Sequence, residues 1–429
     1  MNAIVSSILA FLILVVLFAP RRWAILGMMG GVLYLTQGQS INIIGFNMYP
    51  IRFLEIAGFV RIMIRREFSF QGLNEIDGAF IIFYSYLSIV HLVRTTESSA
   101  ETVGIAIDAL LCYFTFRGLI NNIDNFRLFC RDFIILLIPY VGLILWDFFT
   151  IVNYFVLIGG VSEHIFREGL PRCLGSFRHS ITLGTLGASF LPFYIGMVFE
   201  KKDRARAFIG IVLCVGIVLL SNSGGPLNAT IIVMIGWLLW FARGKMRFVM
   251  SSLIVLLILI AIFMKAPIWY LPAKVSDFSG GGGWHRSYLL EQSIKNISKW
   301  WIAGMPSIET ADWMPYILES SGGADITNQY ISLGLGAGLG AIALFFFLLK
   351  VSFSVLSGAL KAVRAQHQET TNIELLLWSF GIVLAMHIVN WIGVCYYDQI
   401  KMVWFMQLAA IASLSQIYAV PIEKAAVGF

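Results

Sequence analysis

The sequence predicts an all-α polytopic integral membrane protein with about 12–13 transmembrane helices. Its 429 residues are 59% hydrophobic and 13% charged, and their mean hydropathy is +0.82. A soluble globular chain carries roughly 45–50% apolar and about 25% charged residues. The apolar excess recurs along the whole chain in runs of near-membrane length, so we expect a single membrane domain over residues 1–429.

About thirteen apolar runs are long enough to be candidate spans. Basic residues follow the first run instead of preceding it, so we expect an uncleaved span and not a signal peptide. The second run is the least regular, because it contains Gln37, Gln39 and Ser40. The candidate spans are 2–19, 23–42, 48–64, 79–93, 103–119, 132–150, 180–199, 207–221, 226–242, 247–265, 328–350, 372–394 and 401–419.

Lys and Arg fall in alternate loops, and cytoplasmic loops of membrane proteins carry such an excess. The alternation predicts an N-terminus outside and a C-terminus in the cytoplasm. It places two longer loops, 151–179 and 266–327, on the outer side of the membrane. It also accounts for the net charge of +6, so we expect no nucleic-acid partner.

The outer loop 266–327 is the longest break between apolar runs. We expect Trp284–Trp301 to form one amphipathic helix at the membrane interface, with Glu291 and Lys295 in the order that favours an ion pair. One face of this helix would be apolar. At about 100° per residue, that face contains Leu289, Leu290, Ile294, Ile297, Trp300 and Trp301.

Arg286 falls on the apolar face of this predicted helix, within roughly 40° of Leu290 and Ile297. A merely solvated Arg has no reason to be there. It either extends to lipid headgroups, as long cationic side chains do, or turns inward. An inward guanidinium is suited to bind a phosphate group.

The other outer loop, 151–179, ends in an Arg-rich stretch. Arg172 and Arg178 flank Gly175, and His179 stands at the start of the next span. Two arginines beside a Gly-permitted turn can form an anion site, although ordinary loop charges explain this stretch better when it is taken alone. Because Arg286 lies on the same predicted side of the membrane, the anion site becomes a candidate.

A few polar residues lie within the spans. Arg52 and Glu55 are three apart, and we expect an ion pair that fixes helix packing, with support of an acceptor cleft as the alternative. A second group is expected to make interhelical hydrogen bonds. These residues are Asp108, Asp147, His387 and Asn390. No Gly-rich phosphate loop with a Lys, Asp-x-Asp pair or Cys-x-x-Cys occurs, so we expect neither metal nor cofactor.

Three segments resemble, in order, motifs of the O-antigen ligase and O-antigen polymerase superfamily of bacterial membrane glycosyltransferases. RCLGSFRHSITLG is similar to the family's Arg-x-x-Gly-(Thr/Ser)-Phe segment that leads into a span. HRSYLLEQSIKNISKWWIAGMPS resembles its Arg, amphipathic stretch and Pro-Leu-x-Gly. TNQYISLGLGAGLGA resembles its His-Asn-x-Tyr-Leu segment and the Gly-rich run after it.

The resemblance implies metal-independent transfer from an undecaprenyl-diphosphate-linked glycan. Arg172 and Arg286 match the family's arginines on the donor diphosphate, and Arg178 would assist them. Asn328 matches the family's Asn. Thr327 stands where the family has the His that activates the acceptor hydroxyl in ligases.

The general base would therefore be Asp325, His285 or His179. We otherwise expect four residues to position the side chains that contact the substrate. They are Thr327, His179, Arg52 and Glu55. The missing His favours a polymerase of polysaccharide repeat units over a ligase.

We therefore expect a multi-pass enzyme of the bacterial cytoplasmic (inner) membrane that polymerises repeat units of an O-antigen, capsule or exopolysaccharide. Its partners would be the lipid-linked donor, a glycan or lipid acceptor, membrane lipids, a chain-length regulator and a flippase. A ligase would transfer the glycan to lipid A core or another acceptor. A lipid transporter or flippase is the rival class, and it predicts a repeated half and mid-membrane ionisable residues. A scaffold in an envelope assembly would tolerate neutralisation of Arg172 and Arg286.

Overall fold

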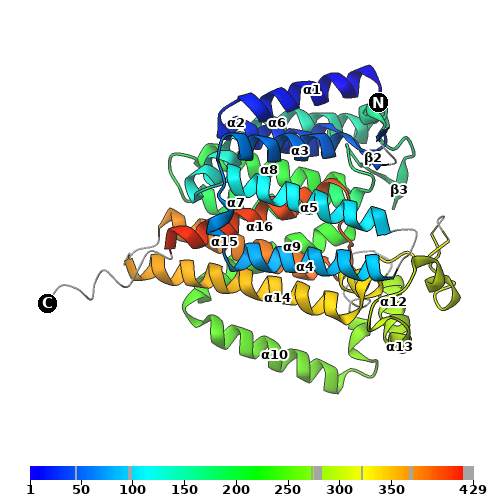
Figure 1. The fold of residues 1–429 in the computed structure, drawn as a ribbon. Coiled ribbons are helices and arrows are strands. Elements are labelled where there is room, and N and C mark those ends of the chain that lie inside the picture. Colours follow the sequence, from blue (N-terminus) through cyan, green and yellow to red (C-terminus); the bar gives the residue numbers. More distant parts are fainter. Residues whose placement is uncertain are drawn as a thin grey trace.

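Thirteen long helices lie side by side in the part of the chain that the structure describes (Figure 1). The structure is a computed structural model that describes residues 1–43, 46–94, 99–271, 274, 283–319, 322–366 and 371–418. The helices correspond in order to the thirteen predicted spans. They are α1 (Ala3–Phe18), α2 (Arg21–Tyr34), α3 (Pro50–Ile64), α4 (Glu75–Val93), α5 (Ser99–Leu119), α6 (Ile123–Thr150), α7 (Ser180–Val198), α8 (Arg204–Leu220), α9 (Gly224–Leu238), α10 (Met246–Phe263), α14 (Gln329–Gln366), α15 (Asn372–Asn390) and α16 (Gln399–Tyr418).

Six helical segments of the described residues are long and apolar enough to cross a membrane. Two further helices, α1 and the Gln399–Leu414 part of α16, are apolar but shorter. The predicted class, an all-α membrane protein, is thereby confirmed. The six segments are Glu75–Val93, Ile123–Thr150, Ser180–Val198, Gly224–Phe263, Gln329–Gln366 and Asn372–Asn390.

Two small antiparallel hairpins mark one end of the bundle, which we call the hairpin end. Strand β1 (Ile41–Ile43) pairs with β2 (Phe46–Met48), and β3 (Ile165–Arg167) pairs with β4 (Leu170–Arg172). The N-terminus lies at this end (Figure 1). There the Asn2 side chain donates a hydrogen bond of 2.7 Å to the Leu157 carbonyl.

The second predicted span, 23–42, is wrong at its end, because α2 ends at Tyr34. The polar side chains that made this run irregular belong to a loop at the hairpin end. In that loop the backbones of Gly38 and Gly159 meet so closely that a Cβ on Gly38 would lie 1.7 Å from the Gly159 carbonyl oxygen. Polar groups that a continued helix would expose to lipid are thus gathered in a folded loop.

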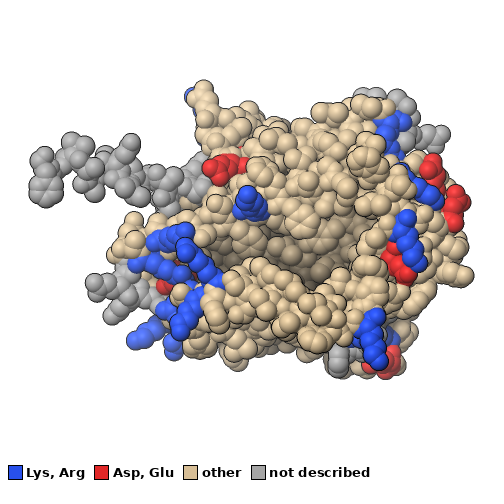
Figure 2. All heavy atoms as spheres, turned by 90° about the horizontal axis from the view of Figure 1, so that it is seen from below, with Lys and Arg blue, Asp and Glu red and all other residues tan. Residues whose placement is uncertain are grey.

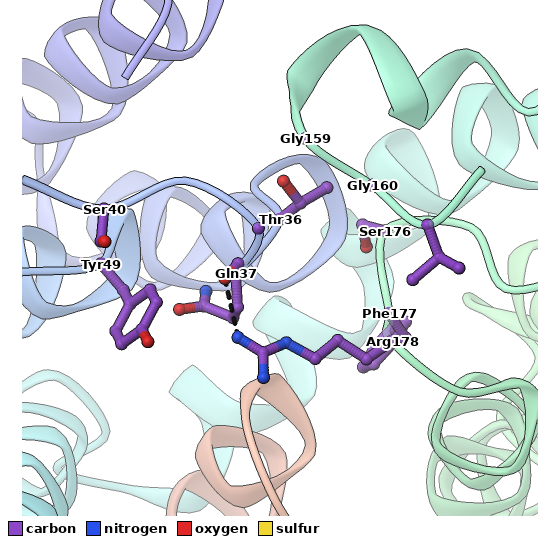
Figure 3. Close-up of a pocket in the computed structure, with 11 residues that line it drawn as sticks. Thr36, Gln37, Ser40, Tyr49, Gly159, Gly160, Ser176, Phe177 and Arg178 are labelled. Carbon is purple, nitrogen blue, oxygen red and sulfur yellow. Dashed lines mark hydrogen bonds between the residues drawn. The ribbon is translucent and has the colours of Figure 1, made fainter. Parts of the chain in front are cut away.

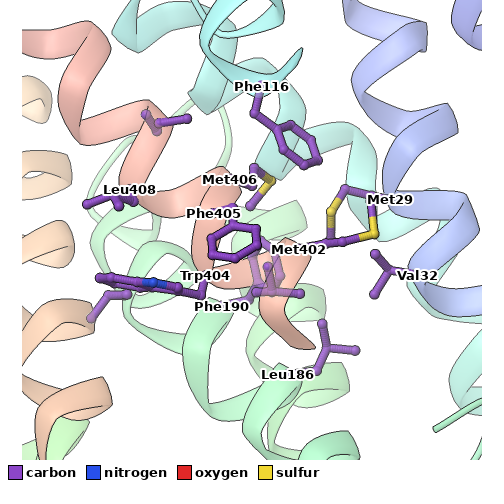
Figure 4. Packing of buried hydrophobic residues seen from close by; sticks show 14 of the residues in the cluster. Met29, Val32, Phe116, Leu186, Phe190, Met402, Trp404, Phe405, Met406 and Leu408 are labelled. Atoms are coloured by element: carbon purple, nitrogen blue, oxygen red, sulfur yellow. The ribbon is translucent and has the colours of Figure 1, made fainter. Parts of the chain in front are cut away.

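Helix α16 is the centre of the bundle. From Met402 to Leu414 every side chain is buried, with apolar residues facing α2, α5 and α7 (Figure 4). Around it pack Met29 of α2 and Phe190 of α7. Close packing of this kind fixes the helices relative to one another. The hairpin-end loops of α2, α7 and α16 are therefore held in fixed positions.

Helix α10 stands apart from the bundle (Figure 1). It has no buried residue, and Phe248, Ile262 and Phe263 are 72%, 68% and 79% exposed. The face that carries α10 is hollowed along its middle, and uncharged residues line the centre of the hollow (Figure 2). An apolar helix exposed all round needs lipid or protein against it.

The predicted single helix Trp284–Trp301 is wrong, because the chain forms α12 (Gly283–Lys295) and α13 (Ile297–Trp300) with a break at Asn296. The predicted ion pair is confirmed, with Lys295 Nζ 2.6 Å from Glu291 Oε1. The apolar face is divided between inside and outside. Leu289 and Trp300 are buried in a small core, whereas Ile294, Ile297 and Trp301 are 44%, 41% and 51% exposed.

This part of the predicted outer loop, which we call the outer segment, docks on a break in α14 at Ala337–Gly338. The Leu339 N–H donates to the Trp301 carbonyl at 2.8 Å, and the Met305 N–H donates to the Leu335 carbonyl at 2.7 Å. Gly338 has φ +78°, and a Cβ there would lie 2.2 Å from the Ile302 carbonyl oxygen. Residues 272–273, 275–282 and 320–321 of the predicted loop 266–327 lie outside the described residues.

Candidate functional site

Arg172, at the end of β4, is the most informative of the predicted site residues. Its Nη2 donates a hydrogen bond of 2.9 Å to Ser223 Oγ. Ser223 Oγ lies 3.0 Å from Ser180 Oγ, and these two serines stand at the starts of α9 and α7. The Nε of Arg172 is buried and has no hydrogen-bond partner among the described residues. Burial and the nearby Arg167 lower the pKa of Arg172.

Two helix N-termini therefore meet at this guanidinium. The first N–H groups of a helix have no intrahelical partner, and the N-terminus carries a partial positive charge. In α9 the N-cap Ser223 makes no capping hydrogen bond with its side chain. Helix N-termini beside an arginine form a favourable environment for an anion.

His179 caps the other helix, α7. Its Nδ1 accepts a hydrogen bond of 3.1 Å from the Ile181 N–H. Burial and the charge of Arg172 lower the pKa of His179 to about 4. The ring is therefore neutral at pH 7, and a neutral ring whose Nδ1 accepts carries its proton on Nε2. In this position His179 is a hydrogen-bond donor, which makes it a poor candidate for the general base.

Arg286 lies on α12 against the loop between α15 and α16. A Cβ on Gly393 of that loop would lie 2.7 Å from Arg286 Nε. Burial lowers the pKa of Arg286, and so does the charge of Arg167, which also acts on Arg172. We call Arg167, Arg172 and Arg286 the arginine cluster. The cluster has an excess of positive charge, since Arg172 makes no ion pair with any described carboxylate.

Asn328 has a structural role, because it joins the start of α14 to the loop against which Arg286 lies. Its Oδ1 accepts hydrogen bonds from the backbone N–H groups of Tyr330 and Ile331 at 2.9 and 3.0 Å, which caps the start of α14. Its Nδ2 donates to the Ile392 carbonyl at 2.9 Å. Asn328 thus fixes the loop against which Arg286 lies, and its own polar atoms are occupied by backbone groups.

The remaining base candidates are His285 of α12 and Asp325, which lies just before α14. His285 Nε2 is 3.0 Å from the Asp325 carbonyl oxygen and 3.9 Å from Asp325 Oδ2. The Asp325 side chain is 44% exposed, so its carboxylate is accessible. Thr327 Oγ1 is buried without a hydrogen-bond partner among the described residues. Of the two base candidates, Asp325 is better placed than His285, because His285 Nε2 is engaged by the Asp325 carbonyl oxygen, whereas the Asp325 carboxylate is exposed and lies 3.9 Å from that nitrogen.

Arg178 has partners outside the arginine cluster. Its Nη2 donates to the Gln37 carbonyl at 2.8 Å, and its Nε lies 3.1 Å from Asp398 Oδ2. An arginine whose charge is balanced by a carboxylate is less suited to bind the donor diphosphate. The geometry therefore does not place Arg178 with Arg172 and Arg286.

Asp398 is a residue that sequence reasoning missed. Its Oδ2 is buried and accepts no hydrogen bond from a described group, although it forms the ion pair with Arg178. Burial raises its pKa. Its φ of +49° is tolerated by Asp and Asn better than by most residues. A carboxylate directly before the last span, on the predicted outer side, is the signal that could have identified it.

The predicted ion pair between Arg52 and Glu55 is wrong, because Arg52 Nε pairs with Asp108 Oδ2 on α5 at 2.7 Å. Glu55 is buried, and its Oε2 has no partner among the described residues. Asp108 thereby joins α3 to α5. The pairing differs because the Asp108 carboxylate on α5 lies closer to the Arg52 guanidinium than the Glu55 carboxylate on α3 does.

The other intramembrane polar residues behave largely as predicted. His387 lies 2.7 Å from Gln407 Oε1 of α16, and Asn390 Nδ2 donates to Thr185 Oγ1 of α7 at 3.1 Å. Both contacts are interhelical. Asp147 pairs with His164 of the following loop at 2.9 Å, not with another helix.

The loop between α15 and α16, residues 391–398, connects these groups. It contacts Asn328 and Arg286 near its start and Arg178 at its end. Comparison with models of known protein families and with curated proteins found no match to this chain. The function is therefore inferred from the residues and their geometry.

Proposed function

We propose that this protein transfers a glycan from undecaprenyl diphosphate at the outer face of the bacterial cytoplasmic membrane, polymerising repeat units of a surface polysaccharide. The observation that carries the proposal is the desolvated guanidinium of Arg172, whose Nε has no partner, at the meeting point of two helix N-termini. The charge of Arg167 lowers the pKa of both Arg172 and Arg286.

A diphosphate is the ligand that suits this arrangement. Guanidinium groups bind phosphate oxygens through paired, charge-assisted hydrogen bonds. Helix N-termini add N–H donors and a favourable field. Partial burial strengthens each of these interactions relative to water. The arginine cluster would therefore hold both phosphates of a lipid-linked donor.

In the proposed reaction an acceptor hydroxyl attacks the anomeric carbon of the donor glycan. The bond between that carbon and the diphosphate oxygen breaks, and the electron pair leaves with the lipid diphosphate. Arg172 and Arg286 neutralise this developing charge. The hydroxyl proton passes to a carboxylate, Asp325 or Asp398. His179 donates through Nε2 and holds the diphosphate further.

The distribution of charge supports an orientation with the hairpin end outside. Figure 2 shows a group of Lys and Arg at the opposite end of the bundle, on the left, and further Lys and Arg beside Asp and Glu on the right. Arg127, Arg243 and Arg364 of that end form ion pairs with Glu200 and Glu374. Cytoplasmic ends of membrane proteins are basic in this way.

The hollow in the face that carries α10 supports lateral entry of the donor from the membrane. Its centre is lined by uncharged residues (Figure 2), and α10 is exposed on all sides. A polyprenyl chain needs such a path, because it cannot leave the membrane while its diphosphate reaches the outer surface.

A complementation experiment tests the proposal. A deletion strain receives Arg286→Ala, Arg286→Lys or, as a matched control, Lys299→Ala, which removes an exposed cation of the same outer segment. We expect chain growth to be lost with Arg286→Ala and reduced with Arg286→Lys, because an ammonium cannot reproduce the guanidinium fork. The control should behave as wild type. Wild-type polysaccharide length with both Arg286 variants would contradict the proposal.

The lipid that accumulates separates polymerase from ligase. Loss of a polymerase leaves single repeat units on undecaprenyl diphosphate. Loss of a ligase leaves long chains on the same lipid. We expect single repeat units, because Thr327 stands where a ligase would need a basic side chain.

A further inference from the structure

A cavity of about 330 Å³ opens at the hairpin end, between the loop after α2 and the loop before β3 (Figure 3). Its size is at the lower end of the range found for small-molecule sites. Arg178 extends across it toward Gln37 (Figure 3). The close approach of Gly38 and Gly159 holds the two loops together at its wall.

Several polar groups of this cavity have no protein partner. Gln37 is 6% exposed, and its Nε2 is buried without a hydrogen bond. The hydroxyls of Ser40 and Tyr49 make no hydrogen bond with any described residue. Thr36 differs, since its hydroxyl donates to the Ile158 carbonyl. A buried amide without a partner costs free energy that a bound ligand can recover.

The charge of this cavity differs from that of the arginine cluster. Its one cation, Arg178, is balanced by Asp398 at 3.1 Å. The guanidinium groups of Arg178 and Arg52 each lie 5.9 Å from the Tyr49 ring, and Arg52 is balanced by Asp108. The cavity thus offers neutral donors and acceptors with little net charge. Such a lining favours an uncharged polyhydroxyl compound over a phosphate or a lipid chain.

We propose that this cavity binds a sugar unit of the acceptor glycan, which would make it the acceptor subsite; this rests on the proposed function. The amide of Gln37 and the hydroxyls of Ser40 and Tyr49 bind sugar hydroxyls. Two short connections join the cavity to the arginine cluster. Arg178 precedes His179 in the chain, and the loop 391–398 runs from the surroundings of Arg286 to those of Arg178.

A binding experiment tests this on the purified full chain in lipid nanodiscs. The probes are the methyl glycosides of glucose, galactose and N-acetylglucosamine, detected by saturation-transfer NMR. We expect a signal from at least one glycoside with wild type, about five- to tenfold weaker binding with Gln37→Leu, and no binding with Ser40→Trp. Ser298→Trp, an exposed position of the outer segment, is the matched control and should bind as wild type.

Farnesyl diphosphate, as a second probe, separates this inference from the proposed function. Arg172→Met should weaken farnesyl diphosphate binding and keep the glycoside signal, whereas Gln37→Leu should weaken glycoside binding and keep farnesyl diphosphate binding. Gln37→Leu conserves side-chain size and decides the matter if Ser40→Trp does not fold. Glycoside binding that is absent in wild type, unchanged in the cavity variants, or lost only in Arg172→Met would overturn the acceptor subsite. Unchanged farnesyl diphosphate binding in Arg172→Met would instead contradict the proposed function.

Discussion

Replacing Arg172 by Met is expected to remove function without destabilising the protein. Loss of the 2.9 Å hydrogen bond to Ser223 costs about 1.5–3 kcal/mol, because the donor is charged. Removal of the buried Nε that has no partner returns about 1–3 kcal/mol. The two contributions nearly cancel, so the free energy of unfolding should change by no more than about 1 kcal/mol. Binding of farnesyl diphosphate should weaken about 10- to 150-fold, because a charge-assisted hydrogen bond to phosphate is lost.

Arg117→Met is the matched control for this prediction. Arg117 is 2% exposed and donates to both oxygens of Asp77, at 2.8 and 2.9 Å. Removing one partner of a buried pair costs about 3–5 kcal/mol. Denaturant unfolding in detergent, followed beside the farnesyl diphosphate titration, compares the two variants. The reasoning is refuted if Arg172→Met destabilises the protein as much as Arg117→Met does, or if it binds the diphosphate as wild type.

Three further predictions concern the surroundings of the site. The pKa of His179 is lowered from 6.5 to about 4, so its contribution to stability is complete above pH 6.5 and is lost as the pH falls toward 4, by up to about 3 kcal/mol. Unfolding measured as a function of pH should show this loss in wild type. An equal loss in His179→Gln would contradict the prediction. Gly38→Ala should destabilise the protein by about 1–3 kcal/mol and abolish glycoside binding, because its Cβ would clash with the Gly159 carbonyl. Gly78→Ala is the control and should do neither, because the space around Gly78 is open. Equal melting temperatures of the two variants would refute this prediction. Asp398→Asn should keep farnesyl diphosphate binding and lower the rate of transfer at least tenfold if Asp398 takes the proton; an unchanged rate would leave that role to Asp325.

The order of the helices was predictable from the sequence, because apolar run length and the alternation of basic loops are local properties. The end of α2 was not. A run that contains Gln37 can continue as a helix or fold into a loop, and contacts with Gly159, far along the chain, decide between the two. The break at Asn296 was missed for the same reason, since α13 is positioned by its docking on α14.

The candidate site was predictable only in part. Arg172 and Arg286 were selected from their loops, and their role in a site stays a prediction; the charge of Arg167, which spacing alone did not single out, lowers the pKa of both. Arg178 was grouped with them because it is near Arg172 in the chain, yet its side chain binds Gln37 and Asp398. Asp398 was missed because its partner is more than two hundred residues away, and pairings of that kind cannot be read from local pattern.

The measurement that tests the central claim most directly is transfer by the purified protein in nanodiscs. The substrate is a synthetic undecaprenyl-diphosphate-linked repeat unit, and both products, lengthened glycan and free undecaprenyl diphosphate, are quantified by mass spectrometry. We predict that wild type releases one undecaprenyl diphosphate for each glycosidic bond formed, and that neither product appears with Arg172→Met or Arg286→Ala. Lengthening that continues in both variants, or movement of the intact lipid across the bilayer without lengthening, would contradict the account.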